Sequence, residues 1–160
     1  MRYYSGMNNS PETAKQWLAK IGQNREGAGE AFVAGLSGHL GAGKTAFVKL
    51  VAKELGIEEV VTSPTFVIMK IYEAGNNGPF KRLVHIDAYR LERRKDLEAL
   101  RFEGIAADPK NLVMVEWPEN VRLAVVDLNT WLKFEIHGGA YTVSVQTEAE
   151  DFLKRSRKLK

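Results

Sequence analysis

The sequence contains no cysteine and no long hydrophobic run. Without cysteine the chain can form neither disulfide bonds nor thiolate metal sites, which is typical of a protein from a reducing compartment. The first residues, MRYYSGMNN, lack the apolar segment of a secretory signal peptide, and no segment approaches the roughly 20 apolar residues of a membrane-spanning helix. We therefore expect a cytoplasmic protein that has no membrane partner.

Internal repeats, low-complexity blocks and long linkers are also missing. A length of 160 residues, of which 44% are hydrophobic and 27% charged, is that of one globular domain spanning residues 1–160. The formal net charge of +3 is concentrated at one end, because residues 154–160 contain several Lys and Arg and no acid. We interpret this basic tail either as a solvated chain end or as a contact for the phosphates of nucleic acid.

Helices and strands are predicted to alternate along the first part of the chain. Residues 10–22 (SPETAKQWLAKIG) combine an N-cap at Ser10 and a proline at the first helical position with apolar residues at helical spacing. Residues 31–37 (AFVAGLS) are apolar without alternation, which favours a strand that is buried on both faces. A second helix is expected from Lys44, and Gly56 is placed to end it.

Further strands are expected in the second part of the chain. The apolar segments at 81–88 and 111–117 are typical of buried strands. The segment at 66–72 (FVIMKIY) is expected to pair with the first of them through a turn at 75–79 (GNNGP). The chain is thus predicted to have an α/β fold, with its tryptophans at 17 and 131 in the core.

The segment GHLGAGKT, residues 38–45, places three glycines between the first predicted strand and the helix that follows. It matches the P-loop pattern G-x-x-x-x-G-K-[ST]. Glycines let successive backbone N–H groups turn toward phosphate without a Cβ in the way, and the helix start adds unpaired N–H groups. We expect Lys44 to reach the β- and γ-phosphates and the Thr45 hydroxyl to bind Mg²⁺.

A P-loop site usually has a carboxylate near the metal at the end of a neighbouring strand, and two strands offer one. One segment reaches Asp87, and another ends its apolar run before Glu116. Either acid could hold Mg²⁺ directly or through water, and one could polarise the attacking water; the alternative for each is a solvated acid at a strand end. Thr65 follows the P-loop helix, where nucleotide switches carry a hydroxyl that senses the metal and the γ-phosphate.

Four blocks together carry a family resemblance: GHLGAGKT, SPTF, HIDAYRL and EWPE, in this order, within roughly residues 10–119. On these blocks the chain resembles the TsaE (YjeE-type) ATPases of tRNA threonylcarbamoyladenosine biosynthesis. The resemblance implies a single compact P-loop NTPase domain with a mixed, mainly parallel sheet flanked by helices. It implies ATP and Mg²⁺ as cofactors and slow ATP hydrolysis. It also implies action with TsaD and TsaB in modifying adenosine 37 of tRNAs that read codons beginning with A, with tRNA contacted indirectly or through the basic tail.

The resemblance also assigns roles to individual residues. Lys44, Asp87 and Glu116 would be catalytic. Thr45, Asp87 and Glu116 would hold the metal, and Thr65 would belong to a switch-like loop. The residues expected to line the nucleotide are Gly38, His39, Leu40, Gly41, Ala42, Gly43, Lys44, Thr45, Ala46 and Trp117.

Two positions depart from the family pattern. His39 stands where Asp is common, and we expect it at the surface of the loop. Ala46 stands where Thr is common, which removes a hydroxyl that can meet the α-phosphate. Because a neutral hydrogen bond contributes about 0.5–1.5 kcal/mol net, and more with a charged group, we expect weaker nucleotide binding but not its loss.

Two other functions remain compatible with the sequence. A small-molecule P-loop kinase usually has a lid with arginines, and Arg90, Arg93 and Arg94 could supply one. A nucleotide-binding switch would hold nucleotide and barely hydrolyse it, whereas a GTPase is disfavoured because the sequence has no N-K-x-D motif. We interpret Tyr89 and Arg90 either as groups that form a recognition surface or reach a phosphate, or as a surface arginine stacked over a tyrosine. No arginine is clearly placed as an arginine finger in cis, although Arg90 could serve as one. His85 has no His or Cys partner at ligand spacing, which disfavours a transition-metal site.

Overall fold

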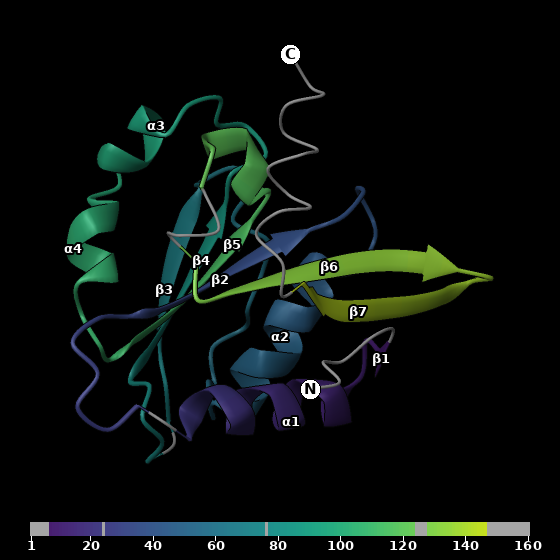
Figure 1. Ribbon diagram of the computed structural model, residues 1–160, viewed down its shortest axis with the longest axis horizontal. Helices are drawn as coiled ribbons and strands as arrows, with labels where there is room; N and C mark the ends of the chain where they lie inside the picture. Colours follow the sequence, from purple (N-terminus) through teal and green to yellow (C-terminus); the bar gives the residue numbers. More distant parts are fainter. Residues whose placement is uncertain (1–6, 24, 76, 124–127, 147–160) are drawn as a thin grey trace.

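The computed structural model describes residues 7–23, 25–75, 77–123 and 128–146, so the basic tail at 154–160 lies outside the described residues. Within these described ranges, seven strands form one sheet in the order β1-β7-β6-β2-β5-β4-β3 (Figure 1). The strands are β1 (Met7–Asn8), β2 (Phe32–Ser37), β3 (Met69–Glu73), β4 (Arg82–Asp87), β5 (Asn111–Glu116), β6 (Thr130–His137) and β7 (Ala140–Gln146). The helices are α1 (Pro11–Gly22), α2 (Lys44–Glu54), α3 (Lys95–Glu98), α4 (Phe102–Ala106) and the 3₁₀ helix η1 (Pro118–Val121).

The centre of the sheet is parallel and both edges are antiparallel. Strand β2 pairs in parallel with β5 and β6, and β5 pairs in parallel with β4. Antiparallel pairing adds β3 at one edge and β7 and β1 at the other. The predicted α/β class is therefore confirmed, with a mixed sheet that is parallel in its centre. Because parallel strands run the same way, the carboxyl ends of β2, β4 and β5 meet at one edge of the sheet.

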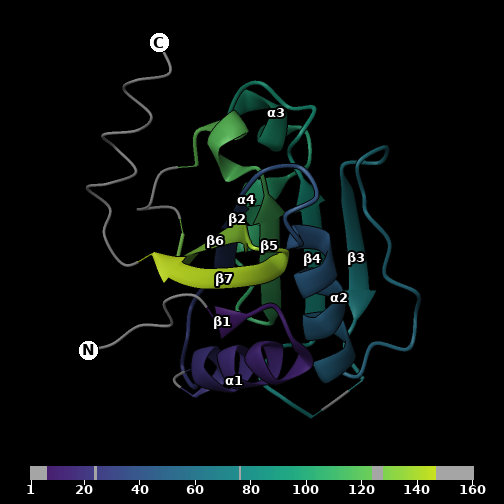
Figure 2. The same ribbon diagram turned by 90° about the vertical axis from the view of Figure 1, so that its right-hand side faces the viewer.

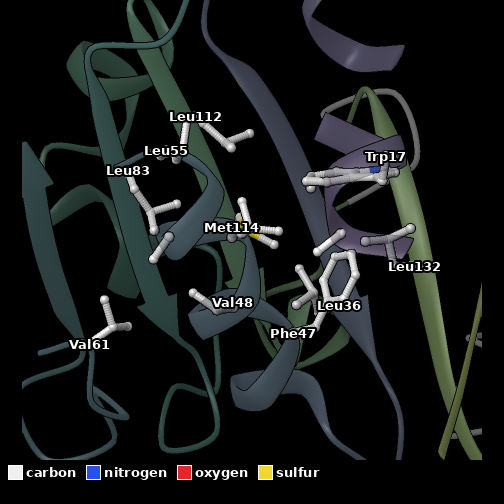
Figure 3. Close-up of a cluster of buried hydrophobic side chains, with 14 of the residues drawn as sticks. Trp17, Leu36, Phe47, Val48, Leu55, Val61, Leu83, Leu112, Met114 and Leu132 are labelled. Atoms are coloured by element: carbon white, nitrogen blue, oxygen red, sulfur yellow. The ribbon is translucent and has the colours of Figure 1, made fainter. Parts of the chain in front are cut away.

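Helices cover the two faces of the sheet differently (Figure 2). On one face α1 and α2 pack against β2, β5 and β6 through a cluster that includes Trp17, Leu36, Phe47 and Met114 (Figure 3). On the other face α3, α4 and η1 contribute apolar side chains to a second cluster. A β-strand presents alternate residues to opposite faces, so a strand covered on both sides must be apolar throughout. This explains the unbroken apolar sequences of β2 and β5.

The predicted helix starts and ends are confirmed. The Ser10 hydroxyl accepts a hydrogen bond from the Thr13 backbone N–H at 3.3 Å, which satisfies one of the free donors at the start of α1. Gly56, with a φ of 69°, follows α2 in the left-handed conformation typical of a residue after a helix end. Both tryptophans predicted for the core, 17 and 131, are buried. Within the described part of the chain, no helix has the length and apolar character needed to cross a membrane.

One strand begins later than predicted. The sequence predicts a strand at 66–72, but β3 begins at Met69. The Pro64 carbonyl accepts hydrogen bonds from the backbone N–H groups of Val67 and Ile68, which closes a turn where the strand was expected. Phe66 is 84% exposed at this turn. The high strand propensity of the aromatic and β-branched residues is thus overridden by local turn formation.

Candidate nucleotide-binding site

The phosphate loop (residues 38–45) needs glycine at its two ends. Gly38 has a φ of 149°, and a Cβ there would lie 2.5 Å from the carbonyl oxygen of Phe134. Gly43 has a φ of 99°, and a Cβ there would lie 2.6 Å from Asn9 Nδ2. Larger residues would therefore be strained in their backbone and would collide with their neighbours. The loop joins the carboxyl end of β2 to the start of α2, as the sequence predicts.

Lys44 is buried inside this loop, with only 4% of the residue exposed. Its ammonium group donates hydrogen bonds to the carbonyl oxygens of Gly38, at 2.6 Å, and His39, at 2.9 Å. The same nitrogen lies 4.2 Å from the centroid of the Trp117 ring. The lysine charge is thus held at the centre of the loop, where the loop backbone and an aromatic face stabilise it.

Acidic residues oppose the cost of burying this cation. Burial lowers the pKa of Lys44, and the negative charges of Glu116, Glu119 and Asp87, in that order, raise it again. Burial also raises the pKa of Glu119, while its hydrogen bond to a backbone N–H and the charge of Lys44 act in the opposite direction. The negative charge of a bound polyphosphate would neutralise the positive charge of Lys44. These acids would then favour an additional cation.

The two predicted metal acids lie side by side at the end of the sheet. Asp87 and Glu116 are register partners on β4 and β5, and both are buried. The Thr45 hydroxyl donates to Glu116 Oε1 at 2.7 Å, and the Thr65 hydroxyl donates to Asp87 Oδ2 at 2.6 Å. The structure therefore brings together Thr45, Thr65 and both acids. These carboxylate and hydroxyl oxygens are hard donors of the type that Mg²⁺ prefers, so the residues present fit that ion.

His85 also belongs to this cluster, and the sequence analysis did not assign it to the site. Its Nε2 lies 2.8 Å from Glu116 Oε1, the same oxygen that accepts from Thr45, and the residue is fully buried. The signal was present in the sequence, because His85 and Asp87 are two residues apart on one strand and share a face of the sheet. The sequence does not show that β4 pairs with β5, and it is this pairing that brings Glu116 next to His85.

Lys44, Thr45, Thr65, Asp87 and Glu116 line an open cavity of about 700 Å³. Volumes of this size are typical of small-molecule sites. Of the predicted nucleotide contacts, seven line the cavity, namely Leu40, Gly41, Gly43, Lys44, Thr45, Ala46 and Trp117. Gly38, His39 and Ala42 do not line it, and His39 is exposed as expected. A smaller cavity of about 420 Å³ lies near the opposite end of α2, beside Leu55 and Pro79, and has a mainly apolar lining.

The aromatic and arginine side chains near the site pair differently from the sequence interpretation. The Tyr89 ring packs on the Trp117 ring with centroids 5.2 Å apart. Arg90 lies over the ring of Phe66 at 4.6 Å, so the interpretation of an arginine stacked over a tyrosine is wrong. Arg93 forms a 3.5 Å ion pair with Asp96. Among the described residues that line the cavity there is no arginine.

Comparison with known proteins shows that this chain is similar to members of one family. The family model described as "Threonylcarbamoyl adenosine biosynthesis protein TsaE" matches residues 8–147. The tRNA threonylcarbamoyladenosine biosynthesis protein TsaE of Borreliella burgdorferi is 37% identical over 119 residues, which are 73% of this chain and 81% of that protein. The protein of the same name from Treponema pallidum is 34% identical over 72% of this chain and 78% of its own length. The Streptomyces coelicolor protein is 44% identical over 85 residues, which are 52% of this chain and 55% of its own length.

A solved structure is similar over nearly the whole chain. The crystal structure of YdiB from Bacillus subtilis superposes with a TM-score of 0.55 at 26% sequence identity, covering 93% of this chain and 90% of that chain.

Proposed function

Because the chain belongs to the TsaE family, whose members act in tRNA threonylcarbamoyladenosine biosynthesis, we propose that it binds ATP with Mg²⁺ and hydrolyses it slowly in support of that modification. TsaB and TsaD are its proposed partners, and adenosine 37 of tRNAs that read codons beginning with A is the proposed site of modification. The observation that carries the proposal is the joining of Lys44, Thr45, Asp87 and Glu116 in one cavity. Membership of the family supports the proposed pathway, and the arrangement of these four side chains supports the proposed chemistry.

Phosphate binding begins at Lys44. Its two hydrogen bonds to loop carbonyls keep the ammonium group pointing into the loop. A polyphosphate would accept these hydrogens instead, and each exchange replaces a neutral acceptor with a charged one, which is the stronger bond. The backbone N–H groups at the start of α2 add the partial positive charge of the helix end.

Metal binding and hydrolysis are assigned to the other three residues. Thr45 and one or both of Asp87 and Glu116 would hold Mg²⁺, which supplies charge neutralisation at the β- and γ-phosphates when bound. One of the two acids would also orient and polarise the attacking water. Thr65 would hold the switch-like loop on Asp87 through the hydrogen bond that links them. An arginine from a partner protein would raise the rate further, by roughly 10³–10⁵.

The proposed function predicts that this chain sustains tRNA modification by its partners. We expect a reconstituted TsaB–TsaD mixture, supplied with tRNA and an activated threonylcarbamoyl donor, to modify tRNA through many rounds when the wild-type chain and ATP are present, and to stall when the chain is left out. The measurement is threonylcarbamoyladenosine formed per TsaD over time. Equal yields with and without the chain would contradict the proposed role, even if ATP were still bound.

Replacing Ala46 with threonine is expected to strengthen ATP binding. The added hydroxyl at the start of α2 can donate a hydrogen bond to the α-phosphate, and a bond to a charged group contributes about 1.5–3 kcal/mol, or roughly a ten-fold to hundred-fold gain in affinity. Titration calorimetry with ATP and Mg²⁺ measures it. Ala46→Val is the matched control, because it adds the same branched shape without the hydroxyl. An equal gain in both variants would mean that shape, not hydrogen bonding, limits affinity at this position.

His85 is expected to act as a positioning residue for Glu116. His85→Leu removes the contact to Glu116 Oε1, so the carboxylate loses one of the two groups that orient it. We expect kcat for ATP hydrolysis to fall about ten-fold, because the hydrogen bond contributes about 1–2 kcal/mol to the correct geometry, while KM changes little. In His85→Gln the side-chain amide can replace the ring nitrogen, and we expect it to recover most of the rate. If both variants lost the same activity, or if KM rose in step with the loss, the contact would be structural only.

A further inference from the structure

Two loops leave the carboxyl ends of the strands that carry the acids. One loop, residues 88–91, follows β4, and the other, residues 117–122, follows β5 and contains η1. Tyr89 and Trp117 line the nucleotide cavity from these loops, whereas Asn120 does not line it. The proposed function uses the acids at the strand ends and names no residue that holds the two loops in place.

Trp117 begins its loop in a backbone conformation that residues with a side chain rarely adopt. Its φ is 57° and its ψ is 47°, in the left-handed region, although a residue before proline favours an extended conformation. Such a conformation persists only where the surrounding contacts hold it. The Trp117 backbone N–H donates to the Leu36 carbonyl at 3.1 Å, and its ring contacts the Lys44 ammonium group. The left-handed turn thus places the indole ring over the lysine.

Asn120 joins this loop to the loop after β4. Its side-chain Nδ2 donates hydrogen bonds to the carbonyl oxygens of Ala88 and Tyr89, both at 3.2 Å. An amide nitrogen carries two hydrogens, so one side chain can serve both acceptors. The Asn120 backbone N–H donates to the Trp117 carbonyl at 3.0 Å, which closes the turn that follows Trp117. Asn120 therefore holds both loops at once.

Tyr89 connects this link to the reacting groups. Its ring packs on Trp117 with centroids 5.2 Å apart. Its backbone N–H donates to Asp87 Oδ1 at 2.9 Å, while Oδ2 of the same carboxylate accepts from Thr65. The Ala88 carbonyl and the Tyr89 N–H belong to one planar peptide unit, so a hydrogen bond to the carbonyl fixes the direction of the N–H. Asn120 thereby orients the donor that holds the Asp87 carboxylate.

We propose that Asn120 is a positioning residue that clamps the loops after β4 and β5 together, so that the Asp87 carboxylate and the Trp117 ring keep their places beside Lys44. This proposal rests on the proposed ATP hydrolysis. Because Asn120 does not line the cavity, it acts through Tyr89 and Trp117 rather than by contact with nucleotide or metal. Its loss is expected to lower kcat more than it raises KM, since the phosphate loop keeps its own contacts.

The test compares Asn120→Ala and Asn120→Asp with the wild type in steady-state ATP hydrolysis with Mg²⁺. Asn120→Ala loses two hydrogen bonds to carbonyl groups, and kcat is expected to fall about five-fold to a hundred-fold while KM changes little. Asn120→Asp keeps the shape of the side chain, but its carboxylate cannot donate to the two carbonyl oxygens, and we expect a larger loss. Asn77→Asp is the matched control, because Asn77 is exposed between β3 and β4, at the end of β4 away from Asp87.

Tryptophan fluorescence separates this role from a merely structural one. Trp17 and Trp131 are 3% and 6% exposed, whereas Trp117 is half-buried, so acrylamide quenching reports mainly on Trp117. We expect stronger quenching in both Asn120 variants than in the wild type, measured without nucleotide at a temperature at which thermal unfolding shows every variant to be folded. Asn77→Asp is expected to be quenched like the wild type.

Three results would overturn the proposal in distinguishable ways. Wild-type kcat and wild-type quenching in both Asn120 variants would remove the clamp and leave the proposed function in place. A lower rate that only follows a lower unfolding temperature, with unchanged quenching of the folded variants, would make Asn120 a structural residue. A wild-type chain that does not hydrolyse ATP even with TsaB and TsaD would contradict the proposed function itself and the role of Asn120 with it.

Discussion

Lys44→Ala is expected to reduce the affinity for ATP by at least about a hundred-fold. The substitution removes a buried cation that donates two hydrogen bonds inside the phosphate loop. A hydrogen bond to a charged group contributes about 1.5–3 kcal/mol, so the loss of two such bonds to phosphate corresponds to about 3–6 kcal/mol. Titration calorimetry with ATP and Mg²⁺ measures the change.

The control for Lys44→Ala must separate phosphate binding from loop stability. Lys53→Ala removes the same charge from the exposed side of the same helix, away from the cavity, and is expected to bind ATP normally. Lys44 also donates hydrogen bonds to two carbonyl groups of the loop. The unfolding temperature of each variant without nucleotide therefore shows whether the substitution destabilises the loop. Unchanged ATP affinity in Lys44→Ala would show that the loop does not bind phosphate in the way the geometry supports.

Glu116→Gln and Asp87→Asn are each expected to lower kcat for ATP hydrolysis by about a hundred-fold or more while ATP stays bound. Each substitution replaces a buried carboxylate with a neutral amide of the same shape. A positioned general base typically contributes about 10²–10⁴ to the rate, and a group that holds the metal contributes several kcal/mol of charge stabilisation. Steady-state hydrolysis at saturating ATP measures the effect, and Glu103→Gln, at an exposed position on α4, is the matched control.

The Mg²⁺ dependence of the two variants distinguishes the roles of the two acids. The variant of the direct ligand needs more Mg²⁺ to reach its maximal rate, because its metal binds more weakly. The variant of the acid that polarises water keeps the wild-type Mg²⁺ requirement and loses only the maximal rate. If both variants retained the wild-type rate, the acids would be no more than buried residues at two strand ends.

The phosphate loop could be predicted from sequence because its determinants are local. The spacing of Gly38, Gly43, Lys44 and Thr45, placed between an apolar strand and a helix, is contained in a few consecutive residues. The strand that carries Glu116 was found for the same reason, since a strand covered on both faces shows as an unbroken apolar run. The strand that carries Asp87 was found from the apolar residues around Val84 and Ile86. The start of β3 was misplaced because a turn closed by the Pro64 carbonyl prevails over strand propensity there.

The contacts that sequence reasoning missed all join segments far apart in the chain. His85 meets Glu116 across a separation of 31 residues, and Asn9 meets Gly43 across 34. Each contact depends on strand order and register, which periodicity along one segment does not encode. The position of Tyr141 beside the phosphate loop was missed for the same reason, because it results from the pairing of β7 with both β6 and β1.

The most direct test of the proposed function is ATP turnover by the purified chain, measured alone and with TsaB and TsaD added. We expect slow hydrolysis by the chain alone and strong stimulation by the two proteins, because a partner group placed at the γ-phosphate completes a site that already holds Lys44 and both acids. The same stimulation should be absent in Lys44→Ala. Turnover that the two proteins leave unchanged, or that survives the loss of Lys44, would contradict a partner-dependent ATPase at this phosphate loop.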